Sequence, residues 1–160
     1  MCIRDRAAAA LFGGGSDAVR IENPISSEMT HMRPDLLPGL LAAAARNQAR
    51  GFMDLALFEC GPVFSGGEPG EQDLHLTAIM VGHTAPRDPF ASRRKVDIYD
   101  AKADAEAVLA QIGAPAKAQI NRKLDGWWHP GRAGNIALGP NTLATFGEIH
   151  PRVLRHFGIK

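Results

Sequence analysis

The segment LFECGPVFSGG, residues 57–67, contains the residue types of an active-site strand. An apolar run carries an acid, Glu59, beside a cysteine, Cys60, and leads into a turn that contains glycine. A cysteine nucleophile needs its thiolate, and therefore a nearby histidine or a helix N-terminus. No such signature surrounds Cys60, and apolar alternation places it on a strand face, where free cysteine usually packs as a small buried hydrophobe. We expect a structural, buried Cys60; a small enzyme that uses Cys60, Glu59 and a histidine is the alternative.

The six histidines do not have the spacing of a metal site. The sequence contains no HExxH or CxxC…H pattern of the kind that holds zinc, so we expect no metal ligands, with a site assembled from distant residues as the alternative. Two histidines precede proline, which favours an extended backbone, and these pairs are expected to mark where strands end and turn. The histidines are His31, His75, His83, His129, His150 and His156, and the pairs are His129-Pro130 and His150-Pro151.

A second group of candidate residues lies in the segment WWHPGR, residues 127–132. Trp127 and Trp128, beside His129 and Arg132, have the chemistry to stack a base or a ligand. Adjacent tryptophans at a sheet edge more often pack on one side and form an interface on the other. The glycines at 13–15 precede Ser16 without the lysine of a phosphate-binding loop, so they predict a linker.

The composition limits the classes of function. The chain of 160 residues has a formal net charge of +1, from 18 basic and 17 acidic residues. This balance disfavours a surface dedicated to nucleic acid, although it leaves room for a local patch such as Arg93-Arg94-Lys95 and for an independent RNA-binding domain as an alternative. Two cysteines, Cys2 and Cys60, give no disulfide framework and favour a reducing cytoplasm. No apolar run approaches the roughly 18 residues of a membrane span.

Two segments have helical periodicity. Asp35 is expected to N-cap a helix that ends at Gly51, with Pro38 in its first turn. The second helix is expected over 96–113 and to end at Gly113. The apolar positions at helical spacing are Leu36, Leu37, Leu40, Leu41 and Ala44 in the first helix, and Ile98, Ala101, Ala105, Val108, Leu109 and Ile112 in the second.

The remaining segments predict strands and loops. In the strand expected at 53–64, alternation places Leu55, Leu57 and Glu59 on one face and Ala56, Phe58 and Cys60 on the other. This pattern, without regular βαβ alternation, predicts an α+β fold with an antiparallel β-sheet flanked by helices. Further strands are expected at 74–83, 116–121, 134–139 and 142–150, loops at 65–73, 83–95 and 127–132, and a terminal helix from residue 150.

The N-terminus changes abruptly from MCIRDR to AAAA. We expect residues 1–17 to be a linker or a non-native start, and 18–160 to form one truncated domain. The chain is expected to be a fragment of a longer protein.

Five blocks, in order along the chain, resemble the beta subunit of bacterial phenylalanyl-tRNA synthetases. The resemblance implies an incomplete class II aminoacyl-tRNA synthetase-like core module, a partner alpha subunit and a second beta subunit in an alpha2-beta2 tetramer. It implies that the whole cytoplasmic enzyme uses ATP and Mg²⁺, that none is bound to this chain, and that tRNA is bound mostly by domains outside it. The blocks are NPISSEMTHMRPDLLPGLLAAAARN, LFECGPVF, VDIYDAKADAEAVL, WWHPGRAGNI and FGEIHPRVL.

The resemblance also implies that this module has no catalytic residues. In catalytic class II subunits, the strand that matches residues 57–64 leads to an arginine that grips the ATP α-phosphate, with an acid two residues later. The matching positions are Ser65 and Gly67, which supply neither charge. The residues that the resemblance suggests for subunit contacts or structure are Pro24, Arg33, Trp128, His129, Arg132, His150 and Pro151.

Overall fold

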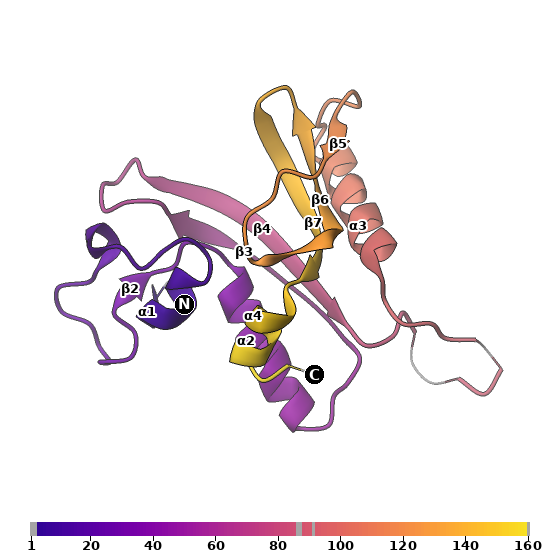
Figure 1. Ribbon diagram of the computed structural model, residues 1–160, viewed down its shortest axis with the longest axis horizontal. Helices are drawn as coiled ribbons and strands as arrows, with labels where there is room; N and C mark the ends of the chain where they lie inside the picture. Colours follow the sequence, from indigo (N-terminus) through magenta and orange to yellow (C-terminus); the bar gives the residue numbers. More distant parts are fainter. Residues whose placement is uncertain (1–2, 86–87, 91, 160) are drawn as a thin grey trace. The chain divides into compact units, whose positions relative to one another are not determined.

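The computed structural model describes residues 3–85, 88–90 and 92–159 (Figure 1). The chain divides into two units, of which the first ends at Ile79 and the second extends from Met80 to Gly158. Helices and antiparallel strands are mixed in the α+β manner that the sequence predicts. Within the described residues, no helix is long and apolar enough to cross a membrane.

The first unit contains a long helix packed against a hairpin. Its elements are β1 (Ile3–Arg4), α1 (Arg6–Ala10), a 3-10 helix (Asp17–Val19), β2 (His31–Met32), α2 (Leu37–Ala49), β3 (Leu55–Phe64) and most of β4 (Gln72–Val81). β1 pairs with β2, and β3 pairs with β4. The short helix α1 stands where a linker was expected, and it buries Ala8 and Ala9; the boundary of the domain at residue 18 stays a prediction.

Helix α2 forms where its sequence predicts, but its N-cap residue is Leu36, so the prediction of Asp35 as the N-cap is wrong by one residue. The Asp35 carboxylate accepts a hydrogen bond from the Leu37 N–H at 2.7 Å, and Pro38 lies in the first turn. Gly51 follows the helix with a φ of 90°, a conformation that glycine adopts without steric cost. The five apolar residues of the expected face are all buried: Leu36, Leu37, Leu40, Leu41 and Ala44.

Strand β3 alternates between two faces as expected. Leu55, Leu57 and Glu59 are half-buried, whereas Ala56 and Phe58 point to solvent. Cys60 shares the solvent-facing set and is exposed, so the prediction of a buried cysteine is wrong. The error arises because helix α2 packs on only one side of the strand, and Cys60 lies on the other.

The second unit is built on an antiparallel sheet of three strands. Its elements are α3 (Ile98–Gln111), β5 (Gln119–Asn121), β6 (Trp128–Leu138), β7 (Asn141–Ile149) and α4 (Pro151–His156). The strand order is β5-β6-β7, and α3 packs against β7 (Figure 1). Asp97 forms a capping box with Asp100 at the start of α3, and Gly113 follows the helix with a φ of 75°.

The expected loop at 127–132 is largely strand, which corrects the prediction. Strand β6 begins at Trp128, and Trp128 pairs with Ile149. The next pair is Ala133 with Gly147, so the register of β6 and β7 shifts between these two pairs. The irregularity explains why a segment with turn-like residues still belongs to the sheet.

Candidate functional site

The inner face of β3 holds a buried arginine, Arg33. Its side chain is 2% exposed and its Nη1 lies 2.5 Å from Oε1 of Glu59. Its Nε donates to the Pro62 carbonyl at 2.8 Å, and its own carbonyl accepts from the Phe64 N–H at 2.9 Å. Arg33 therefore binds three positions of the strand. The inner face of the strand that resembles an active-site strand therefore binds an arginine of the same chain.

Gly61 provides the space for that guanidinium. A Cβ at this position would lie 2.5 Å from Nη2 of Arg33, whose other bonds to Glu59 and Pro62 hold it in place. We expect Gly61→Ala to lower the free energy of unfolding by about 2 kcal/mol, measured by urea denaturation. Gly70→Ala is the matched control, because a Cβ there meets no atom within 4 Å. Equal stability of the two variants would contradict this role of Gly61.

The alternative of a cysteine enzyme gains no support from β3. Glu59 faces Arg33, whereas Cys60 lies on the opposite, exposed face of the strand. The acid and the thiol are therefore not brought together. Over the residues that the structure describes, no group of three or more His, Cys, Asp or Glu side chains is placed to hold a metal ion.

Ser65 helps to close the β3–β4 connection, whereas Gly67 lies close to the backbone of Ala18. The Ser65 N–H donates to the Glu71 carbonyl at 2.9 Å, and its hydroxyl donates to the same oxygen at 3.1 Å. A Cβ on Gly67 would lie 2.6 Å from the Ala18 carbonyl oxygen, so a side chain at this position would collide with backbone. Neither position offers a charge.

Pro24 is half-buried in the segment between the 3-10 helix and β2. The ends of this segment are close together, because Arg20 forms a bridge with His31 and the Ile21 N–H donates to the Thr30 carbonyl at 2.9 Å. Pro24 and Arg33 belong to the first unit, and the other five predicted residues belong to the second.

The two His-Pro pairs of the second unit share one local structure. Nδ1 of His129 accepts a hydrogen bond from the Gly131 N–H at 3.1 Å, and Nδ1 of His150 accepts one from the Arg152 N–H at 3.2 Å. In each pair the ring binds the backbone two residues later, across the proline. His150 thereby caps α4, with Pro151 as its first residue. This confirms the expected turn at the second pair, whereas the first pair lies within β6.

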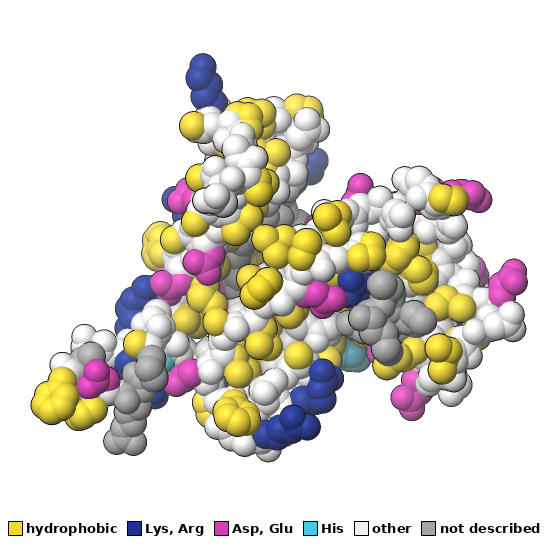
Figure 2. Space-filling model, turned by 180° about the vertical axis from the view of Figure 1, so that it is seen from behind, with side chains coloured by type: hydrophobic (Ala, Val, Ile, Leu, Met, Phe, Trp, Pro, Cys, Tyr) yellow, Lys and Arg dark blue, Asp and Glu magenta, His cyan; other side chains and the backbone are white. Residues whose placement is uncertain are grey.

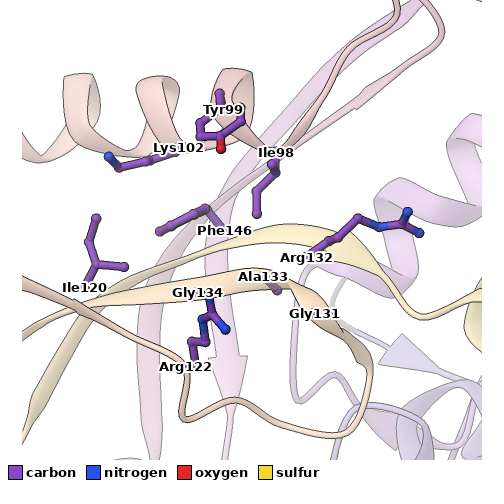
Figure 3. A pocket seen from close by; sticks show the side chains of 10 residues that line it. All are labelled: Ile98, Tyr99, Lys102, Ile120, Arg122, Gly131, Arg132, Ala133, Gly134 and Phe146. Carbon is purple, nitrogen blue, oxygen red and sulfur yellow. The ribbon is translucent and has the colours of Figure 1, made fainter.

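A cavity of about 330 Å³ lies in the second unit (Figure 3), and its lining includes Gly131 and Arg132, which follow the first His-Pro pair. Arg132 reaches it from β6 and also pairs with Glu148, with 2.8 Å between Nε and Oε2. Most of its other lining residues fall within the blocks of the resemblance, but no pattern in the sequence brings them together, and Ile120 and Arg122 lie outside every block. Its lining consists of Ile98, Tyr99, Lys102, Ile120, Arg122, Gly131, Arg132, Ala133, Gly134 and Phe146.

Near this cavity, the first turn of α3 contains a strongly perturbed carboxyl group. The hydrogen bonds from Arg94, together with that from the Asp97 N–H, lower the pKa of Asp100 to about 2. Because the pKa is lowered on folding, the group favours the folded state above about pH 4, and that contribution disappears as the pH falls towards 2. We expect the Asp100 carboxyl signal in NMR to titrate near pH 2, and Arg94→Ala to raise the midpoint. A midpoint unchanged by Arg94→Ala would contradict this cause.

The comparisons with known proteins agree with the resemblance in the sequence. The family model described as "Phenylalanyl tRNA synthetase beta chain CLM domain" matches residues 3–160. The chain therefore belongs to this family, whose members are domains of the synthetase beta chain.

Curated relatives carry a more particular name. The chain is 74% identical over 156 residues to the "Phenylalanine--tRNA ligase beta subunit" of Cereibacter sphaeroides, a match that covers 98% of this chain and 19% of the relative. It is 69% identical over 157 residues to the protein of the same name from Ruegeria pomeroyi, a match that covers 98% of this chain and 20% of the relative. A third, from Rhodospirillum rubrum, is 51% identical over 97% of the chain and 20% of the relative. The chain thus spans about a fifth of the length of these relatives.

Proposed function

We propose that this chain is a non-catalytic module of phenylalanine–tRNA ligase, the enzyme that activates phenylalanine with ATP and joins it to its tRNA. The observation that carries the proposal is the match of residues 3–160 to a family of synthetase beta chains. The names of the relatives, at up to 74% identity, support the same assignment. No specific observation favours an independent enzyme or a free-standing RNA-binding domain.

The proposed role of the module is assembly with the catalytic alpha subunit, within an alpha2-beta2 tetramer. The solvent-facing side of β3 and β4 supports this role, because its exposed side chains are apolar. Phe58 is 76% exposed, Leu74 is 74% exposed and Leu76 is 48% exposed. Figure 2 shows that hydrophobic side chains are exposed on one face of the molecule. Exposed apolar patches of this kind are typical of interaction surfaces.

The further parts of the proposal follow from the family. Residues 18–160 would form part of a class II aminoacyl-tRNA synthetase-like core. The residues that would stabilise the module or its interface are Pro24, Arg33, Trp128, His129, Arg132, His150 and Pro151. ATP and Mg²⁺ would serve the whole cytoplasmic enzyme at the alpha subunit. The lack of charge at Ser65 and Gly67 supports the proposal that catalysis takes place at the alpha subunit.

The first test compares the subunits alone and mixed. The full-length beta subunit that contains this chain is expected to aminoacylate tRNA only after the alpha subunit is added, and the mixture should elute as one complex. The absence of a complex, or charging of tRNA by the beta subunit alone, would contradict the proposal.

A substitution of Ser65, which matches the ATP-binding arginine of catalytic subunits, tests whether this module takes part in catalysis. We expect Ser65→Ala in the assembled enzyme to leave kcat/KM within about twofold of the wild type, because the Ser65 hydroxyl bonds only the Glu71 carbonyl among the described contacts. A loss of about tenfold or more, with the complex intact, would assign Ser65 a part in the reaction.

A further inference from the structure

The segment between the 3-10 helix and β2 presents an isoleucine to solvent. Ile25 is 98% exposed, and the acidic residues Glu22 and Glu28, three positions before and after it, are also exposed. Neither carboxylate forms a hydrogen bond or an ion pair with any residue in the described part of the chain. Residues 22–28, which we call the acidic loop, therefore place an unburied apolar side chain between two unpaired acids.

The acidic loop is held by hydrogen bonds that do not involve its isoleucine. At its base, the Ile21 N–H donates to the Thr30 carbonyl at 2.9 Å. Within it, the Ser26 carbonyl accepts from the Met29 N–H at 3.1 Å, and the Ser26 hydroxyl accepts from the Glu28 N–H at 3.2 Å. Because these bonds are formed in advance, little conformational freedom is lost when the loop binds.

The cavity of the second unit has the complementary chemistry. Figure 3 shows Ile98 on α3, Ile120 on β5 and Phe146 on β7 directed into it. Phe146 is buried, whereas Ile120 is 50% exposed, so the apolar lining is accessible from solvent. No acidic side chain is among the described lining residues, and the cations among them are Lys102, Arg122 and Arg132. An apolar cavity lined with cations fits an apolar side chain that is flanked by carboxylates.

The three cations are available to such carboxylates. Nζ of Lys102 lies 3.4 Å from Oε1 of Glu106, and Arg132 pairs with Glu148. Both pairs are accessible to solvent and therefore weak, so other carboxylates can compete for the cations. Arg122 makes no hydrogen bond or ion pair with any residue in the described part of the chain. Its guanidinium is thus available for a bidentate contact with a carboxylate.

The charges of the two units favour a contact between copies of the chain. Acidic residues outnumber basic ones up to Ile79, whereas basic residues outnumber acidic ones from Met80 to Gly158. The first unit of one copy and the second unit of another therefore carry opposite net charges and attract each other.

We propose that the acidic loop of one copy docks into this cavity on a second copy. Ile25 enters the cavity beside Ile120 and Phe146. Glu22 and Glu28 reach the cations of the lining. One buried isoleucine and a few exposed ion pairs make a weak contact, so it forms at high protein concentration or where an assembly holds two copies together. The proposal goes beyond the proposed function, because the contact joins two copies of this chain and does not involve the alpha subunit.

The test uses the full-length beta subunit that contains this chain, as a concentrated mixture of isotope-labelled and unlabelled protein without the alpha subunit. A water-soluble carbodiimide joins carboxylates to amines in contact, and mass spectrometry identifies the linked peptides. We expect links between Lys102 and Glu22 or Glu28 that join a labelled to an unlabelled peptide, with a yield that falls as the salt concentration rises. The link between Lys102 and Glu106 within one copy is the internal reference.

Two substitutions that leave the linked residues unchanged test the two sides of the contact. Ile25→Asn and Arg122→Glu should each reduce the mixed-isotope link about tenfold or more. The matched controls are Ile112→Asn and Arg155→Glu, which make the same changes at exposed positions that do not line the cavity. Both controls should leave the link within about twofold of the wild type.

Three results would overturn the proposal. In the first, no link joins the acidic loop to Lys102, or a different acidic segment of the full-length subunit is linked in its place. In the second, both ends of every link carry the same isotope, because the contact then lies within one chain. In the third, the variants and the controls behave alike.

Discussion

Replacing Arg33 by leucine is expected to lower the free energy of unfolding by about 2 to 3 kcal/mol. The substitution removes the partner of Glu59, whose side chain is 31% exposed, and leaves the Pro62 carbonyl without its 2.8 Å hydrogen bond. Loss of one member of a fully buried ion pair costs about 3 to 5 kcal/mol, and the partial exposure of Glu59 reduces that cost. Urea denaturation followed by circular dichroism measures the change.

Two further variants distinguish the effect of breaking the Arg33–Glu59 ion pair from the effect of removing an arginine in general. Arg46→Leu removes an exposed arginine from α2 and should change the stability by less than about 0.5 kcal/mol. Combining Arg33→Leu with Glu59→Leu should recover part of the loss, because no unpaired charge is then left on β3. If the double variant were much less stable than Arg33→Leu alone, the role assigned to the pair would be wrong.

Leu74→Asp should weaken the association of the full-length beta subunit with the alpha subunit by about 30- to 100-fold. The substitution places a charge on the apolar face of the β3–β4 hairpin, which the proposed interface would have to desolvate. The affinity is measured by titrating labelled alpha subunit with the beta subunit.

The neighbouring residue, His75, provides the control. It is also exposed, but alternation along β4 directs it to the other side of the strand from Leu74. His75→Asp should leave the affinity within about threefold. Equal weakening by both variants would point to a general electrostatic effect, and no weakening by Leu74→Asp would show that another surface binds the alpha subunit.

The local elements of the fold could be predicted from the sequence because their causes are local. Pro38 in the first turn and Gly51 after the last turn indicate the two ends of α2, and period-2 alternation indicates the two faces of β3. The capping residues of α3 and α4 similarly lie beside the helices that they cap.

The errors concern features that depend on partners distant in sequence. The burial of Cys60 depends on which face of β3 is covered, and alternation alone does not specify this. The strand character of 128–132 depends on its pairing with β7, where Gly147 adopts a φ of 143° opposite Ala133. Local turn signals in WWHPGR gave no information about that partner.

The candidate sites show the same division. Arg33 was suggested by the resemblance, but its contacts with Glu59 and Pro62, 26 and 29 residues away, required the structure. Arg122 lies in no motif, and its place in the lining of the cavity of the second unit required the structure. The net charge of +1 also conceals a difference between the units, because the chain has 6 basic and 10 acidic residues up to Ile79 but 11 basic and 7 acidic residues from Met80 to Gly158.

The central claim is that this module contributes assembly to the ligase and takes no part in its chemistry. The most direct measurement is the rate of tRNA aminoacylation by the alpha subunit as the concentration of full-length Leu74→Asp beta subunit rises. Assembly alone predicts that the variant needs a higher concentration for half-maximal activity but reaches the same maximal rate as the wild type. An unchanged half-maximal concentration with a reduced maximal rate would contradict the claim.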